Sequence, residues 1–358
     1  MFYVLILLVF LCASCTDKSD IVQFPSVKNV YSNKLFETYV SVPLELNKEK
    51  DIIYISDFKG DSLLWCYNLN DTNFIKRLLP KGIGPDEFLS PVQFFFSDST
   101  IYVYNRWHFY GKKYSFNKDS LIMKPLTKMI KYPTNIDMIC PLTENRWIAF
   151  GRFENSRFLI LNNNGEIISK GGDYPEYKEG EREIPNFPKF MFHQSMFGFN
   201  KLTSRILSVT SHVLDLWDFS QDSLILYKRV LLSPYDYNYN MGEEWASAEP
   251  IGETENGVRR VYVSPKYIYL LYDSNTLNMK KREKDKLNSE IWIFDWEGMP
   301  IQKLQIDAKL ICFCVDEEEN AIINDEVSLP KEETSVVEEE DIVAQITPIV
   351  DSNLPLDD

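Results

Sequence analysis

The stretch "RFLILNNNGEIISKG", from Arg157 to Gly171, has the pattern of a β-hairpin. An apolar run leads into Asn163-Asn164-Gly165, residues that tolerate left-handed backbone, and a second β-type run follows. The same plan of strand, polar turn and strand recurs in this 358-residue chain at residues 62–79, 101–116, 212–232 and 290–306. Since no unit shows helical periodicity, we expect a repetitive all-β structure.

Further short strands lie between these hairpins, so each unit holds about four strands, which is near the size of a propeller blade. A sixth unit can be assembled from the two ends of the chain. Residues 309–325 supply two inner strands, residues 339–350 a third, and residues 35–46 the outer one. We therefore predict a six-bladed β-propeller of antiparallel blades, closed by N- and C-terminal strands, because full closure protects strand edges.

The first residues predict export. Phe2 to Leu11 is an unbroken apolar run, too short to span a bilayer as a mature helix, and Ala13-Ser14 follow it directly before Cys15. This order resembles a bacterial lipobox, which implies a signal peptide over residues 1–14, lipid on Cys15 and a tether over residues 15–33. The alternative is an ordinary signal peptide with an incidental cysteine.

Charge is concentrated at the C-terminal end. The chain carries a net charge of −15, and almost all of it belongs to residues 316–358. The body is therefore close to neutral, and we expect a solvated acidic tail over residues 351–358. A basic stripe with interleaved aromatic residues is missing from the sequence, which disfavours nucleic-acid binding.

The segment "KGIGPDEFLSP", from Lys81 to Pro91, invites a phosphate-loop interpretation that its surroundings exclude. A strand precedes it, but no helix follows, and Pro85 removes one N–H from the supposed cradle. We expect instead that Gly82 and Gly84 supply turn dihedrals, that Pro85 stiffens the passage between blades, and that Phe88 plugs the core between them.

This segment resembles a G-x-G-P-x-E-F element that follows the first hairpin in one family. The lipidated signal and the short β units of the chain add to the resemblance. That family is the TolB-like six-bladed propeller lipoproteins of Bacteroidetes, and the element here consists of Gly82, Gly84, Pro85, Glu87 and Phe88. The resemblance implies a propeller over residues 34–350 and a place in the cell envelope, at the outer membrane. It brings no assigned reaction.

Two long insertions, residues 171–197 and 233–257, are rich in aromatic side chains. Such side chains suit protein interfaces and stacking on sugar rings, because they combine an apolar face with a polar tip. The alternative is that they pack the insertions onto the propeller. The candidate binding residues are Tyr174, Tyr177, Tyr235, Tyr237, Tyr239 and Trp245. In contrast, Trp107 to Tyr110 is interpreted as blade core.

No catalytic motif or metal-ligand spacing stands out, and Cys312 and Cys314 are expected as buried apolar residues on one strand face. We therefore expect a non-catalytic, monomeric scaffold without a cofactor that binds an envelope protein or a glycan through one propeller face. The alternative is a metal-assisted hydrolase or lactonase of the central tunnel, whose ligands would come singly from several blades.

Overall fold

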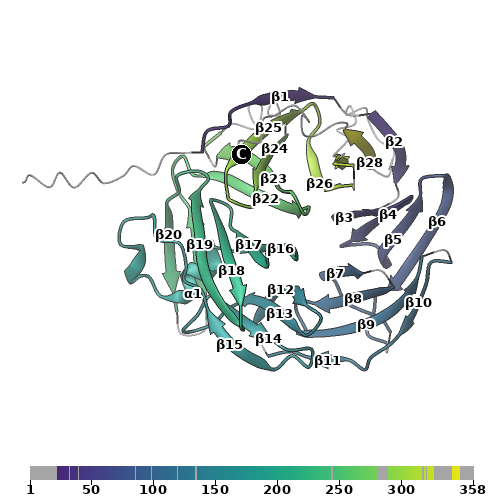
Figure 1. The fold of residues 1–358 in the computed structure, drawn as a ribbon, viewed down its shortest axis with the longest axis horizontal. Coiled ribbons are helices and arrows are strands. Elements are labelled where there is room, and N and C mark those ends of the chain that lie inside the picture. Colours follow the sequence, from purple (N-terminus) through teal and green to yellow (C-terminus); the bar gives the residue numbers. More distant parts are fainter. Residues whose placement is uncertain are drawn as a thin grey trace, which may run out of the picture.

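The computed structural model describes residues 22–31, 33–38, 40–84, 86–97, 99–118, 120–133, 135–242, 245–276, 278–279, 289–316, 318–319, 321–325 and 341–346. Within these ranges, six sheets of four or five strands stand around a common axis and form the ring in Figure 1. The predicted all-β, six-bladed propeller is confirmed. Cys15, Pro85 and the acidic tail over residues 351–358 lie outside the described residues.

The first three blades follow the chain from the inner strand to the outer strand. Blade 1 consists of β3 (Pro43–Glu49), β4 (Ile52–Asp57), β5 (Ser62–Asn68) and β6 (Asp71–Pro80). Blade 2 consists of β7 (Val92–Ser97), β8 (Thr100–Asn105), β9 (Tyr110–Asn117) and β10 (Ile122–Pro125), with β11 (Ile130–Lys131) also paired to β9. Blade 3 consists of β12 (Ile136–Thr143), β13 (Arg146–Gly151), β14 (Phe158–Leu161) and β15 (Ile167–Gly171).

The remaining blades include both ends of the described chain. Blade 4 consists of β16 (Met196–Asn200), β17 (Arg205–Val209), β18 (Val213–Ser220) and β19 (Ser223–Leu231). Blade 5 consists of β22 (Glu255–Val263), β23 (Tyr267–Thr276), β24 (Ser289–Asp295) and β25 (Pro300–Ile306), with β1 (Val27–Val30) on its outer edge. Blade 6 consists of β26 (Leu310–Val315), β27 (Ala321–Asp325), β28 (Asp341–Ile346) and β2 (Asn33–Thr38).

Ring closure uses both chain ends, as the sequence predicts. The N-terminal strand β2 pairs antiparallel with β28, with Glu37 opposite Ile342. The outer strand expected over residues 35–46 is in fact two strands, because β2 ends at Thr38 and β3, the inner strand of blade 1, begins at Pro43.

The predicted tether over residues 15–33 extends too far along the chain. Val27–Val30 form β1, which pairs in parallel with β25, and Phe24 packs edge-on against Trp292 and Phe294 at ring-centroid distances of 5.1 and 5.4 Å. The chain is therefore already docked on blade 5 at residue 24. The physical reason is that a short segment of alternating exposure can complete a sheet edge without a turn signal of its own.

Hydrophobic clusters between neighbouring blades hold the ring together. Six clusters of buried residues each join one blade to the next, and the last joins blade 6 to blade 1. Strand β4 shows how alternation achieves this, because Tyr54 packs toward blade 2 whereas Ile53 and Ile55 pack toward blade 6. Cys312 and Cys314 are both buried in the cluster between blades 6 and 1, as expected.

The two insertions flank blade 4. The first contains the 3-10 turn η1 (Glu181–Glu183) and the helix α1 (Asn186–Phe192), and the second contains the hairpin of β20 (Tyr237–Met241) and β21 (Ala246–Pro250). Figure 1 shows α1 and β20 beside β19, at one side of the ring. Among the described residues, no helix is long and apolar enough to cross a membrane.

Candidate functional site

Blade topology sends both insertions to the same end of the ring. Within each blade the strands alternate in direction, so the link to the next blade and the loop between the second and third strands share one end. The insertions, residues 172–195 and 232–254, are two of these links. We call this end the insertion face, and the opposite end, which carries the other loops, the hairpin face.

A buried carboxylate joins the two insertions. Glu181 is 1% exposed and accepts hydrogen bonds from Tyr235 Oη (2.8 Å), Tyr237 Oη (3.0 Å) and His193 Nε2 (2.7 Å). Two backbone N–H groups of the preceding turn also donate to it. Burial alone would raise the pKa of Glu181, but the hydrogen bonds from His193 and Tyr235 outweigh it and lower that pKa to about 2. The charged form therefore holds the insertions in one arrangement.

Two histidines are buried beside this carboxylate. Burial lowers the pKa of His193, although its hydrogen bond to Glu181 acts in the opposite direction. Burial also lowers the pKa of His212 to about 3. The His212 ring stacks on Phe192 at 5.6 Å and on Tyr235 at 5.4 Å, so both histidines belong to the packing between the insertions and blade 4.

A buried ion-pair network lies in blades 3 and 4 beneath the first insertion. Asp215, which is 0% exposed, accepts from Arg157 Nη1 at 2.6 Å and from Arg229 Nε at 2.6 Å. Arg157 is itself 0% exposed, and Arg229 Nη2 also donates to the backbone oxygen of Asp173, at the start of the insertion. The network therefore joins the insertion to the outer part of blade 4.

These contacts correct half of the predicted binding surface. Tyr174, Tyr235 and Tyr237 are buried, with exposures of 4%, 9% and 1%, because the two insertions cover each other and blade 4. For these three residues the packing alternative holds. Tyr239 and Trp245 are exposed, at 42% and 57%.

Four exposed aromatic side chains lie at the insertion face. Tyr177, Tyr239 and Trp245 lie on the insertions, and Trp107, 63% exposed, lies in the loop between β8 and β9 at the same end of the ring. The interpretation of Trp107 as blade core is therefore wrong. Strand β8 ends at Asn105, whose side-chain oxygen accepts from the backbone N–H of Trp107, so Trp107 lies in the turn after the strand.

A cavity of about 380 Å³ opens beside Trp107 between blades 2 and 3. Its polar lining includes Arg106, whose Nη2 donates to both carboxylate oxygens of Asp137 at 2.8 and 2.9 Å. Phe187 and Phe190 of α1 line the cavity as well, so the first insertion reaches across to blade 2. An apolar rim over a fixed ion pair is a common arrangement for recognition of a partner.

Charges from several blades converge next to this cavity. Arg260 of β22 donates from Nε to the backbone oxygen of Leu44 in β3 at 3.1 Å, although blade 6 separates blades 5 and 1 in the ring. Burial raises the pKa of Glu45 to about 7, against the effect of the nearby Arg260 and Arg106 guanidinium groups. The Glu45 carboxyl group therefore changes charge near neutral pH.

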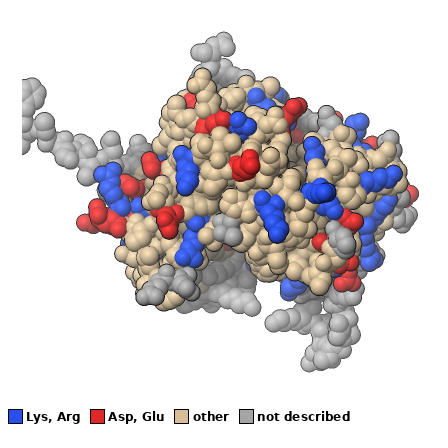
Figure 2. All heavy atoms as spheres, turned by 90° about the horizontal axis from the view of Figure 1, so that it is seen from below, with Lys and Arg blue, Asp and Glu red and all other residues tan. Residues whose placement is uncertain are grey.

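These charges do not resemble a metal centre. In the part of the chain that the structure describes, no three His, Cys, Asp or Glu side chains are grouped as ligands for a metal ion. Glu45 and Asp137 stand beside guanidinium groups instead, which disfavour a bound cation. Figure 2 shows Lys and Arg side chains in separate groups, interspersed with Asp and Glu.

The glycine segment between blades 1 and 2 bends the chain for a reason that the sequence did not reveal. Neither Gly82 nor Gly84 has a positive φ, so neither uses the left-handed backbone that glycine alone adopts readily, although Glu87 N–H closes a turn on the Gly84 carbonyl oxygen. Both make room for the carboxylate of Glu87, which accepts from the Gly84 backbone N–H at 2.8 Å. Phe88 is 1% exposed in the core between blades 1 and 2, where it was expected.

Gly82→Val is expected to lower the free energy of unfolding by about 1–3 kcal/mol. A Cβ at Gly82 would lie 2.0 Å from Glu87 Oε2, so the carboxylate must leave its hydrogen bond to Gly84. Urea denaturation measures the change. Ile83→Val is the control, because Ile83 is 90% exposed and its substitution should change stability by no more than about 0.5 kcal/mol. Equal stability of the Gly82 and Ile83 variants would contradict the expectation.

Comparison with known proteins assigns the family. A family model described as TolB-like 6-blade propeller-like matches residues 23–318. The chain belongs to this family. The match begins next to Phe24, which packs on blade 5 of the TolB-like propeller, and it ends in the loop between β26 and β27.

Two solved structures are similar to this chain at low sequence identity. A protein from Bacteroides fragilis, described as an exported protein, is 10% identical with a TM-score of 0.55, and the match covers 90% of this chain and 99% of that one. A member of the DUF4221 family from Bacteroides vulgatus is 11% identical with a TM-score of 0.48, over 92% and 99% of the two chains. The search among curated proteins finds no match.

Proposed function

We propose that this TolB-like propeller is a non-catalytic binding module that recognises an envelope protein through its insertion face. The observation that carries the proposal is a preformed cavity at the insertion face, whose lining combines the exposed Trp107 and phenylalanine side chains with the ion pair of Arg106 and Asp137. Aromatic and arginine side chains are enriched where proteins bind one another, and the ion pair of Arg106 with Asp137 fixes the geometry of the polar lining.

Rigidity of this face supports recognition of one partner shape. The buried Glu181 fixes the two insertions against each other, and Asp215 fixes the first insertion to blade 4 through Arg229. A preorganised surface loses little conformational entropy on binding, so more of the contact energy contributes to affinity. A glycan is the other ligand class that aromatic side chains suit, and the experiment below separates the two.

The envelope is the proposed location, with lipid on Cys15 as the anchor in the outer membrane. The apolar run before Ala13-Ser14-Cys15 supports this placement. The similar protein from Bacteroides fragilis is described as exported, which agrees with it. Docking of Phe24 on blade 5 leaves a short segment between Cys15 and the propeller.

Trp107→Ala is expected to weaken partner binding by about 2 kcal/mol, roughly thirtyfold in Kd, because a large aromatic group at a cavity rim is a typical hot spot. The chain is immobilised and exposed to detergent-solubilised envelope fractions, and the captured protein is then purified. Titration calorimetry gives its Kd for the parent and for the variant.

Leu202→Ala is the matched control. Leu202 is 80% exposed in the loop between β16 and β17, at the hairpin face, so its loss should leave Kd unchanged. If Leu202→Ala abolished binding while Trp107→Ala did not, the binding face would be the opposite one. Capture that Trp107→Ala weakens, that survives protease treatment of the envelope fraction and that is lost after glycosidase treatment would identify a glycan at the insertion face and overturn the protein assignment.

A further inference from the structure

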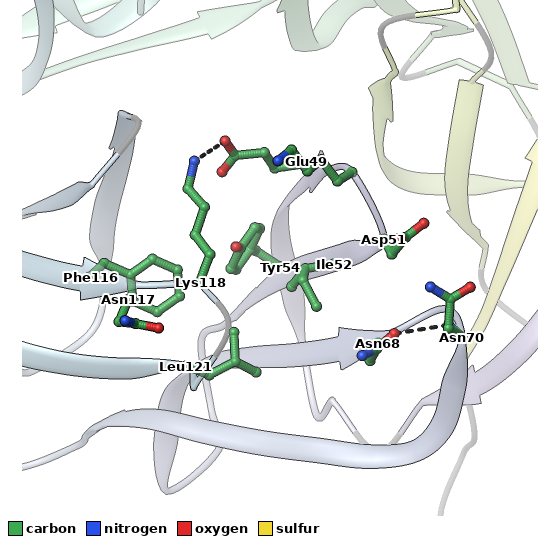
Figure 3. A pocket seen from close by; sticks show the side chains of 11 residues that line it. Glu49, Asp51, Ile52, Tyr54, Asn68, Asn70, Phe116, Asn117, Lys118 and Leu121 are labelled. Carbon is green, nitrogen blue, oxygen red and sulfur yellow. Dashed lines mark hydrogen bonds and ion pairs between the residues drawn. The ribbon is translucent and has the colours of Figure 1, made fainter.

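A second cavity lies at the hairpin face, between blades 1 and 2. Its volume is about 540 Å³, within the range of pockets that hold small ligands. Its lining comes from three connections: residues 49–51 between β3 and β4, residues 68–70 between β5 and β6, and residues 116–118 and 121 at the passage from β9 to β10. Figure 3 shows the residues of blade 2 on one side of this pocket and those of blade 1 on the other.

The lining is polar, and among its described residues the charges balance. Glu49 and Asp51 carry negative charge, Lys50 and Lys118 carry positive charge, and Lys118 Nζ forms an ion pair with Glu49 Oε1. An anionic ligand would meet the two carboxylates, and a cationic ligand would meet the two ammonium groups. The pocket therefore favours a neutral ligand.

Amide groups in the lining are held in fixed orientations. Asn117 Oδ1 accepts from the backbone N–H and the hydroxyl of Ser120, both at 2.9 Å. Asn68 Oδ1 accepts from the backbone N–H of Asn70, also at 2.9 Å. Because each carbonyl oxygen is committed to its own turn, the amide nitrogen is the end that these side chains offer to a ligand as a donor.

Tyr54 supplies an independent sign that the pocket is incomplete. The side chain is 1% exposed, and its ring packs on Phe96 at 4.7 Å and on Phe116 at 5.9 Å. Its hydroxyl is buried and has no hydrogen-bond partner among the described residues. A buried hydroxyl without a partner is uncommon and calls for an explanation. The hydroxyls of Tyr114 and Tyr174 share this state, but of the three tyrosines Tyr54 alone lines the pocket.

We propose that this pocket binds a neutral saccharide unit, one of whose hydroxyl groups becomes the missing partner of the Tyr54 hydroxyl. Sugar hydroxyls donate and accept, so they can use the carboxylates as well as the amide nitrogens of Asn68 and Asn117. In Figure 3 the Tyr54 ring lies between Lys118 and Ile52, with the Glu49–Lys118 pair above it in the view. The side chains of that pair are 30% and 24% exposed, so a change of rotamer admits the ligand.

The test measures sugar binding by saturation-transfer NMR. The probes are glucose, galactose, mannose and N-acetylglucosamine at millimolar concentration, with glucuronic acid and glucosamine as charged counterparts. Tyr54→Phe removes only the unpartnered hydroxyl and should weaken binding of the neutral sugar at least tenfold. Tyr114→Phe, the matched control, removes an equivalent buried hydroxyl elsewhere and should leave binding unchanged.

Stability of the unliganded variants provides a second measurement. Because neither hydroxyl has a partner, both tyrosine variants should melt at or above the parent temperature. Asn70→Ala, at an exposed position of the lining, should also weaken binding without a change in melting temperature. The proposal is overturned if no neutral probe binds, if a charged probe binds better, if both tyrosine variants bind equally, or if Tyr54→Phe lowers the melting temperature.

Discussion

Asp215→Asn is expected to lower the free energy of unfolding by about 3–5 kcal/mol, because it leaves buried guanidinium charge without a counter-ion. The amide keeps the shape of the carboxylate but removes the charge that Arg157 Nη1 and Arg229 Nε contact, each at 2.6 Å. Burial already lowers the pKa of Arg157, which the Asp215 carboxylate opposes. Urea denaturation of the parent and the variant measures the loss.

Asp218→Asn is the control on the same strand. Asp218 also faces an arginine, Arg205, at 3.0 Å, but its side chain is 45% exposed. Exposed ion pairs contribute about 0–1 kcal/mol, so this variant should stay close to the parent. Similar losses for the two substitutions would show that burial of Asp215 does not determine its importance.

Acid is expected to destabilise the propeller through His212. An unperturbed histidine gains its proton near pH 6.5, whereas burial lowers the pKa of His212 to about 3 in the folded protein. As the pH falls below 6.5, the unfolded state binds a proton that the folded state does not, so stability is lost. The loss reaches about 2 kcal/mol at pH 5 and stops growing below about pH 3. Urea midpoints between pH 7 and pH 4 measure it.

His212→Gln should flatten this dependence, since it removes the titrating group from the stack between Phe192 and Tyr235. His193 is still present in the variant, and its pKa is also lowered by burial, so part of the slope remains. His108→Gln is the control, because His108 is exposed in the loop after β8. A parent protein whose stability is constant from pH 7 to pH 5 would contradict the expectation.

Most of the fold follows from local sequence signals. Each predicted hairpin contains its own evidence, as Asn163 to Gly165 does for β14 and β15, because alternation and turn residues lie next to each other in the chain. The sixth blade was also predictable, since the strands expected near the two chain ends belonged to none of the five hairpin units. The helix α1 was not, because its seven residues are too few for helical periodicity to show.

Much less of the site was predictable. Tyr237 and Tyr239 lie two residues apart on β20, a spacing that places both on one face, yet Tyr237 is 1% exposed and Tyr239 is 42% exposed. The difference comes from Glu181, 56 residues away from Tyr237, and sequence spacing does not contain that contact. The two cavities are equally absent from sequence spacing. Arg106 and Asp137 line one of them, Tyr54 and Lys118 line the other, and each pair comes together only when neighbouring blades pack.

The parallel pairing of β1 with β25 has a mechanical consequence. A pull on the chain from residue 22 would first load the packing of Val22 and Phe24 against the cluster between blades 4 and 5, and then the hydrogen bonds along β1. Only after both gave way would force reach β2, the strand that closes the ring. The outer edge of blade 5 therefore bears a force applied at the N-terminal end, and the sheet that closes the ring carries no load while β1 stays paired.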